Sequence, residues 1–327
     1  MKRLFSAAAV GFALTCASLA QAAAPPEQLR LWRKGIVAAK ADAGFAFMAA
    51  RKGFAEKHGL RIEISQFTGD AVMLRALIAG QLDSYDGSPG APMIAVARGA
   101  DLRLTGCQWP VLTYGIFARA TIASPSDLRG KTMAISAPGA MPDILARALL
   151  DQYKIPVASV RFAPMGGDVD RFQALSNGVV DVAPVSSEMV PVAAAQRLKL
   201  LVHAQDVMPN YLRLCTYMSA RTIAQNKETA AHYLAAEMEA LRYALGHREE
   251  ELALTRTITG TAASDPRPAY IFDEVVKRNA ITPAMEIPLP KLHWMQELLV
   301  KSGDLPRPVI PRMVDDSVRQ RALQLVR

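Results

Sequence analysis

The residues that could carry catalytic chemistry do not combine into a complete catalytic motif. Gly130-Lys131-Thr132 resembles the end of a phosphate-binding loop, but Pro125 stands where that loop needs a glycine. Gly87-Ser88-Pro89-Gly90 resembles a nucleophile elbow, but Asp86 replaces its first glycine. The five histidines do not fall at metal-ligand spacing, and the chain contains no H-E-x-x-H sequence. We therefore expect neither covalent nor metal chemistry, no cofactor and no enzymatic activity.

The composition excludes several other classes of protein. The chain has 327 residues, of which 51% are hydrophobic and 21% are charged, so it can bury a large core and is not disordered. The formal net charge is +8, but the basic residues are scattered rather than clustered, which does not favour nucleic-acid binding. Three cysteines are too few for a disulfide-stapled mini-domain or a cysteine-rich zinc protein. The length favours two domains.

The first 22 residues have the features of a secretory signal peptide. Lys2 and Arg3 precede an uncharged apolar run, and Ala20-Gln21-Ala22 supplies an A-x-A cleavage site. The apolar run is short for a membrane span, although an N-terminal membrane anchor is the alternative interpretation. We expect cleavage after Ala22 and a mature protein in the periplasm.

Cleavage at this site would remove Cys16 and leave Cys107 and Cys215 in an oxidising compartment. The two cysteines could pair, provided that the fold brings their Cα atoms close enough for a disulfide. The alternative is two buried free thiols that act as small hydrophobic side chains. Both possibilities stay open at the level of the sequence.

Expected strands and helices alternate along most of the mature chain, joined by short loops. Residues 60–64 alternate as a strand, 70–79 form a helical pattern that Gly80 ends, and 83–86 form a short strand. This rhythm is typical of an α/β architecture with largely parallel strands. From residue 228 onward the sequence predicts mainly helices.

An internal repeat connects two parts of this pattern. Seven residues recur at a constant offset of 98: Gly69, Asp70, Ala76, Leu77, Gly80, Asp83 and Ser88 match Gly167, Asp168, Ala174, Leu175, Gly178, Asp181 and Ser186. Each copy predicts a strand, a Gly-Asp turn, a helix, a second strand and a serine turn. In open parallel sheets such turns lead into helix N-termini, whose unpaired N–H groups can bind ligands. Two copies, one in each lobe, would direct these helix ends toward a shared cleft for a small ligand.

Four motifs resemble a single family in their order and spacing. They are a helix that ends in K-x-G-L at residues 47–60, A-L-x-x-G-x-x-D at 76–83, D-L-[KR]-G-K at 127–131, and a second A-L-x-x-G-x-x-D at 174–181. Together they resemble the substrate-binding proteins of bacterial ABC importers, in the NMT1/THI5-like branch of sulfonate, nitrate, taurine and thiamine-precursor binders. The resemblance covers about residues 29–260.

This resemblance implies a type II periplasmic binding protein fold, in which two open-sheet α/β lobes enclose a ligand cleft. The first lobe would comprise residues 25–118 and 219–327, and the second lobe residues 119–218. The protein would capture a small organic ligand, anionic or aromatic, by lobe closure and deliver it to an ABC permease and ATPase in the inner membrane. We expect a monomer without a nucleic-acid partner. The alternatives are a same-fold enzyme of thiamine-pyrimidine or related cofactor biosynthesis, or a periplasmic ligand sensor.

The resemblance also implies that loops between strands and helices hold the ligand. The candidate binding residues are Lys40, Phe67, Thr68, Gly69, Gly87, Ser88, Gln108 and Trp109 in the first lobe, and Ser136, Gly139, Gly166, Gly167, Ser186 and Ser187 in the second.

Different roles are expected of these candidates. The serines would donate hydrogen bonds beside helix N-termini. Trp109 and Phe67, together with Tyr85, would form an apolar wall, with core packing as the alternative for Phe67 and Tyr85. Lys40 would suit an anionic ligand, with a solvated loop lysine as the alternative. We interpret Asp70 and Asp168 as helix N-caps.

Overall fold

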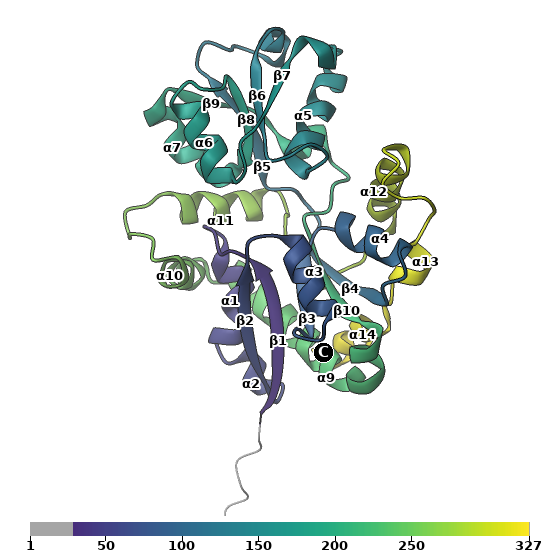
Figure 1. Cartoon of the computed structure of the whole chain (residues 1–327). Helices are drawn as coiled ribbons and strands as arrows, with labels where there is room; N and C mark the ends of the chain where they lie inside the picture. The colour runs from purple at the N-terminus through teal and green to yellow at the C-terminus, as the bar shows by residue number, and fades with distance from the viewer. Residues whose placement is uncertain (1–28, 327) are drawn as a thin grey trace, which may run out of the picture.

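Two lobes, each built on a five-stranded sheet, make up the computed structural model, which describes residues 29–326 (Figure 1). The first sheet contains β1 (Arg30–Val37), β2 (Leu60–Phe67), β3 (Ser84–Gly87), β4 (Leu102–Trp109) and β10 (Leu214–Ser219), in the order β2-β1-β3-β10-β4. The second sheet contains β5 (Tyr114–Arg119), β6 (Thr132–Ile135), β7 (Arg161–Pro164), β8 (Val182–Ser186) and β9 (Leu198–His203), in the order β7-β6-β8-β5-β9. This is the two-lobed α/β architecture that the sequence predicts.

Both sheets are mixed rather than purely parallel. In the first sheet β1 is parallel to β2 and β3, whereas β10 is antiparallel to β3 and β4. In the second sheet β6 is parallel to β7 and β8, whereas β5 is antiparallel to β8 and β9. The expectation of largely parallel strands therefore fails for β5 and β10. Each of these strands enters its sheet directly from the other lobe, without the crossover helix that a parallel connection normally requires.

Helices flank both sheets (Figure 1). The first lobe and the long C-terminal region contain α1 (Ala43–Arg51), α2 (Phe54–Lys57), α3 (Asp70–Ile78), α4 (Gly90–Ala97), α9 (Ala220–Gly246), α10 (Arg248–Thr259), α11 (Arg267–Lys277), α12 (Leu289–Lys301), α13 (Ile310–Met313) and α14 (Ser317–Leu325). The second lobe contains α5 (Met141–Gln152), α6 (Asp168–Ser176), α7 (Val190–Ala193) and α8 (Ala204–Val207), with short 3₁₀ turns between them.

The internal repeat corresponds to one structural unit that occurs in both lobes. The unit β2-α3-β3 occupies the same place in the first sheet as β7-α6-β8 does in the second. Gly80 and Gly178, which follow the two helices, have the same left-handed backbone with φ of 73°. A glycine adopts this conformation without the steric cost that a side chain would add, which explains why both helices end there.

The chain crosses between the lobes twice. It leaves the first sheet after β4 and returns to it through the segment that precedes β10. Strand β5 pairs within the second sheet, so the first crossing precedes β5. Strand β10 pairs within the first sheet, so the second crossing precedes β10. The crossings thus fall several residues earlier than the expected lobe limits at 118 and 218.

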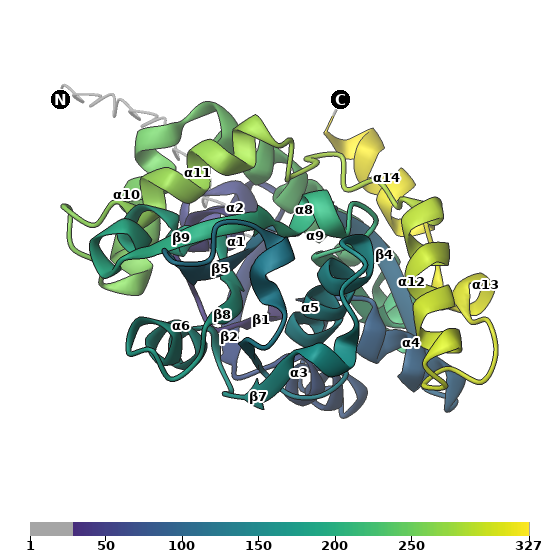
Figure 2. The same cartoon turned by 90° about the horizontal axis from the view of Figure 1, so that it is seen from above.

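Helix α11 extends the C-terminal region onto the second lobe, where it contacts α7, and it lies between the two lobes in Figure 1. Figure 2 shows α11 beside α10. The hydroxyl of Ser187 donates a hydrogen bond to Glu274 of α11. His203 Nδ1 lies 3.3 Å from a carboxylate oxygen of the same Glu274. The part of the chain after residue 219 therefore contacts both lobes rather than only the first.

A disulfide joins Cys107 of β4 to Cys215 of β10. Both cysteines are fully buried, and their strands are antiparallel neighbours in the first sheet. Of the two possibilities that the sequence left open, the structure shows the paired one.

The expected signal peptide, residues 1–22, lies outside the described residues. Between residues 29 and 326, no helix combines the length and the apolar character needed to cross a membrane.

Candidate ligand-binding cleft

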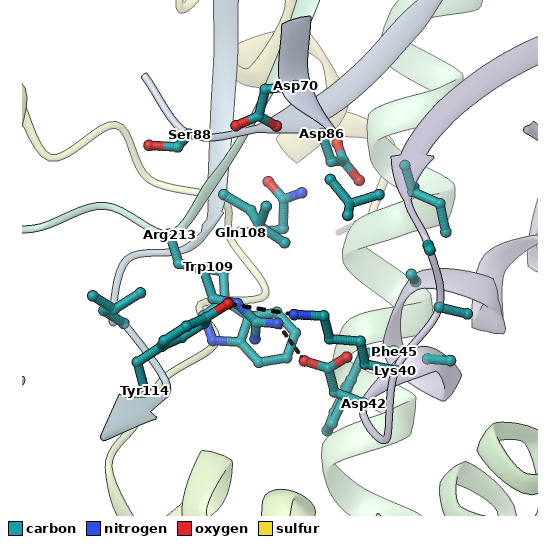
Figure 3. A pocket seen from close by; sticks show the side chains of 18 of the residues that line it. Lys40, Asp42, Phe45, Asp70, Asp86, Ser88, Gln108, Trp109, Tyr114 and Arg213 are labelled. Atoms are coloured by element: carbon teal, nitrogen blue, oxygen red, sulfur yellow. Dashed lines mark hydrogen bonds and ion pairs between the residues drawn. The ribbon is translucent and has the colours of Figure 1, made fainter. Parts of the chain in front are cut away.

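A cavity of about 220 Å³ lies where the two lobes meet (Figure 3). The first lobe supplies most of its wall, from β1 and the loop that follows, the start of α3, the ends of β3 and β4, and α9. The second lobe supplies Tyr114 of β5 and Met141 of α5, and the returning crossing segment supplies Tyr211 and Arg213. The cavity is therefore enclosed by both lobes and by one of the segments that connect them.

Lys40, Ser88, Gln108 and Trp109 are the sequence candidates that line this cavity. The structure does not bring the other candidates to its wall, namely Phe67, Thr68, Gly69, Gly87, Ser136, Gly139, Gly166, Gly167, Ser186 and Ser187. Some of these have other partners. The Ser187 hydroxyl bonds to Glu274, and the Gly139 amide donates to Asp143 at 2.8 Å. The two copies of the repeat thus contribute unequally to the cavity.

Lys40 forms an ion pair between the lobes. Its ammonium contacts the carboxylate of Asp168, at the start of α6, and lies 3.4 Å from the Tyr114 hydroxyl. Tyr114 donates to the same carboxylate at 2.7 Å, and Arg171 also pairs with it. Although burial opposes its charge, Asp168 has a pKa below its usual value because Lys40 and Arg171 are close. The positive charge of Lys40 is therefore already balanced by the second lobe.

This contact also corrects the expected role of Asp168. The N-cap of α6 is Gly167, and Asp168 is the first residue of the helix, with a side chain that faces Lys40. A second link between the lobes lies beside it, where the Ala41 amide donates to Glu188 at 3.1 Å.

Arg213 and Trp109 form a second cluster on the wall of the cavity (Figure 3). The Arg213 guanidinium lies 4.0 Å above the centre of the Trp109 ring and is 2.5 Å from a carboxylate oxygen of Asp42. Phe45 meets the Trp109 ring edge-on, with a centroid distance of 5.7 Å. Within the described chain, the buried atoms Trp109 Nε1 and Arg213 Nη1 have no hydrogen-bond partner. Buried polar groups are normally paired, so these two N–H groups can donate to a ligand acceptor.

Lys34 lies at the floor of the cavity between two acidic side chains. Its ammonium is 3.1 Å from Asp86 and 2.9 Å from Glu237, and all three side chains are buried. Burial raises the pKa of Glu237 to about 7, although Lys34 opposes this shift. The Thr216 hydroxyl donates to Asp86 at 2.7 Å and fixes that carboxylate. The cation on the floor is therefore balanced as well.

Asp70 is the carboxylate of the cavity that has no cationic partner. No Lys, Arg or His nitrogen among residues 29–326 forms an ion pair with it. Burial raises the pKa of Asp70 to about 6, and the backbone N–H of Ser88 opposes this shift. The expected N-cap role is wrong here too, because Gly69 is the N-cap of α3 and Asp70 is its first residue.

Gly87 lies behind the wall of the cavity and leaves space for the Asp70 side chain. A Cβ at position 87 would lie 2.7 Å from the Tyr85 ring and 2.9 Å from an Asp70 carboxylate oxygen. We predict that Gly87→Ala displaces Asp70, lowers stability by about 1–3 kcal/mol and weakens ligand binding. Thermal unfolding and calorimetric titration would measure both effects.

Gly90→Ala is the matched control, because a Cβ at position 90 would meet nothing within 4 Å. If Gly87→Ala matched Gly90→Ala in both stability and binding, Gly87 would have no role in shaping the cavity.

The residues around the cavity offer hydrogen-bonding and apolar contacts rather than a metal centre. Among the described residues, no group of three or more His, Cys, Asp or Glu side chains is arranged to hold a metal ion. Ser88, whose hydroxyl borders the cavity, lies 3.0 Å from the Tyr211 hydroxyl rather than next to a basic group. This geometry suits recognition of a bound molecule.

Two mixed sheets with the same strand order, and a cavity between them, define the periplasmic binding protein fold. The family described as NMT1/THI5 like matches residues 40–251, and the chain belongs to this family. The resemblance that the sequence motifs indicate is thus confirmed. No curated protein sequence matches the chain significantly.

Solved structures share the fold over almost the whole chain. The periplasmic aliphatic sulphonate binding protein SsuA from Escherichia coli has a TM-score of 0.71 and 21% identity, over 91% of this chain and 98% of SsuA. The alkanesulfonate-binding protein SsuA from Xanthomonas axonopodis pv. citri, bound to MOPS, has a TM-score of 0.68 and 18% identity, over 90% and 99% of the two chains. The desulfurization enzyme DszB has a TM-score of 0.66 and 15% identity, over 90% and 100%. At these identities the similarity shows a common fold.

Proposed function

We propose that this protein is an exported solute-binding protein that captures a small organic molecule between its lobes and delivers it to an ABC-type permease. The observation that carries this proposal is the cavity enclosed by both lobes and by a crossing segment. Membership of the NMT1/THI5 like family and the fold shared with the two SsuA proteins support it. The expected periplasmic location and the cleavage after Ala22 are part of the same proposal.

Closure of the two lobes is the step that captures the ligand. Lys40 and Asp168 come from different lobes, as do Ala41 and Glu188, so these contacts exist only when the lobes are together. A ligand that touches Tyr114 or Met141 and also Trp109 has contacts with both lobes in this state alone. Such a ligand shifts the population toward the closed form by hinge motion.

Binding rather than catalysis is the activity that the cavity supports. The Ser88 hydroxyl, which borders the cavity, lies 3.0 Å from the Tyr211 hydroxyl and not beside a base, so the described lining residues do not form an activated nucleophile. The fold alone does not decide this point, because the desulfurization enzyme DszB shares it.

The test combines a binding screen with a measurement of shape. Thermal shift against a library of small organic compounds identifies binders, and small-angle scattering then compares the ligand-free and saturated protein. We expect a raised melting temperature and a smaller radius of gyration in the saturated protein. A protein that binds none of the compounds, or that releases a chemically altered product, would contradict the proposal.

Trp109 is predicted to report binding through its fluorescence, because its ring borders the cavity beneath Arg213. A saturating ligand should change the emission of the wild-type protein, and Trp109→Phe should abolish most of that change. Trp32 serves as the internal reference, since it is buried against Tyr233 in the core of the first lobe. An undiminished change in Trp109→Phe would place the responding tryptophan elsewhere.

A further inference from the structure

Each cation that lines the cavity is paired with a carboxylate, whereas one lining carboxylate has no cation among the described residues. Lys34 is paired with Asp86 and Glu237, Lys40 with Asp168, and Arg213 with Asp42. Asp70 remains without a cation among the described residues, although its carboxylate borders the cavity (Figure 3). The site therefore carries an excess of negative charge at the end where Asp70 and Ser88 lie.

The internal repeat shows that this imbalance is specific to the first lobe. Asp70 and Asp168 are equivalent residues, each the first of its helix. In the second lobe the residue three positions later is Arg171, which pairs with Asp168. In the first lobe the equivalent residue is Met73, which is fully buried and cannot pair with a carboxylate. The chain thus satisfies one aspartate internally and leaves its counterpart available to the cavity.

The surroundings of Asp70 keep its carboxylate in place but do not neutralise it. The backbone N–H of Ser88 and the N-terminus of α3 favour the ionised form, whereas burial disfavours it. With a pKa of about 6, Asp70 is mainly ionised at neutral pH, and residues 29–326 supply no cation that pairs with it. A cationic ligand group would supply the missing counter-ion.

The rest of the cavity has a different character. Ile36, Leu112, Met141, Leu214 and Leu241 give it apolar walls. Trp109 Nε1, on a side chain that is only 4% exposed, and Arg213 Nη1 supply N–H groups without partners in the described chain. An acceptor atom on the ligand would satisfy one of these groups.

We propose that the ligand is a small organic cation, whose protonated amine or equivalent charged N–H group contacts Asp70 and whose apolar body fills the space toward Trp109. This assignment rests on the proposed function and narrows its ligand class. It favours the aromatic alternative of the sequence expectation over the anionic one, because the cations that would attract an anion are already paired.

The experiment uses two sets of three probes. Within each set the apolar body is the same, and only the polar group differs: an ammonium, an alcohol or a sulfonate. One set is benzylammonium, benzyl alcohol and benzylsulfonate, and the other is the corresponding cyclohexylmethyl series. Calorimetric titration and thermal shift at a pH of about 8 compare the three charge types on the wild-type protein. We expect the ammonium probe to bind at least about 10-fold more tightly than its alcohol or sulfonate analogue.

Asp70→Asn tests the residue itself. It should weaken ammonium binding by about 30-fold or more, as expected when one member of a buried charge pair is lost, and change alcohol binding little. Asp151→Asn, an exposed carboxylate of α5, is the control and should leave both unchanged. Thermal unfolding checks that Asp70→Asn is folded.

The possible failures are distinguishable. Tighter binding of the sulfonate or alcohol probes, or ammonium binding that Asp70→Asn leaves intact, would overturn the cationic ligand class alone. Failure of every probe to bind the wild-type protein would count against this class and against the proposed small-organic ligand together.

Discussion

Reduction of the Cys107–Cys215 disulfide is expected to lower the free energy of unfolding by about 3–5 kcal/mol. The two cysteines are 108 residues apart, so the crosslink removes the entropy of a long loop from the unfolded chain. The loop contains the second sheet, because β4 leads out to that lobe and β10 returns from it. The disulfide therefore joins β4, after which the chain leaves the first lobe, to β10, where the chain returns to it. Urea unfolding with and without a reductant measures the difference.

The double variant Cys107→Ala/Cys215→Ala provides the control for this prediction. It should show a similar loss of stability, and its unfolding midpoint should no longer respond to the reductant. A wild-type protein that keeps its stability after mass spectrometry shows complete reduction would contradict the prediction. Such a result would mean that the fully buried packing around both cysteines, rather than the crosslink, holds β4 against β10.

Local patterns in the sequence predict the elements that local interactions determine. The strand that begins at residue 60 and the helix that begins at Asp70 lie where the patterns indicate, and the glycines at 80 and 178 end their helices. The repeat correctly identifies the equivalent units of the two lobes. The assignment of β5 and β10 to their sheets was not predictable in this way, because it depends on partners such as β8 and β3 that are distant in the sequence.

The same distinction between local patterns and distant partners applies to the residues of the site. Loop positions near strand ends led to Lys40, Ser88, Gln108 and Trp109, all of which line the cavity. The partner of Lys40 is Asp168, 128 residues away in the other lobe, and no local pattern connects the two.

Two further groups were missed for identifiable reasons. Tyr211 and Arg213 lie in the returning crossing, whose position the sequence placed too late. The contrast between Met73 and Arg171 within the repeat was a signal that could have distinguished Asp70 from Asp168.

Replacement of Lys34 by methionine is expected to lower the free energy of unfolding by about 3–5 kcal/mol near neutral pH. The substitution nearly preserves the volume of this side chain, which is 1% exposed, but removes the cation that lies between Asp86 and Glu237. Two buried carboxylates then remain without a counter-ion on the floor of the cavity, and loss of one member of a buried ion pair costs more than the pair contributes. Lys277→Met, an exposed and unpaired lysine of α11 within the described chain, should change stability by less than about 0.5 kcal/mol.

The pH dependence of Lys34→Met gives this prediction its sharpest test. Glu237 has a pKa raised from 4.5 to about 7 in the folded protein, and removal of Lys34 raises it further. A carboxyl group with a raised pKa binds its proton more tightly in the folded state than in the unfolded state. Its ionisation therefore destabilises the fold once the pH rises above the pKa that the group has in the unfolded chain. Because the wild-type protein already loses this stabilisation up to about pH 7, the stability deficit of Lys34→Met relative to wild type should grow as pH rises above about 7. The double variant Lys34→Met/Glu237→Gln should recover part of the loss at high pH, because one of the two buried carboxylates is gone. A deficit that stays constant with pH, and that Glu237→Gln does not reduce, would show that Lys34 acts through packing and not through its charge.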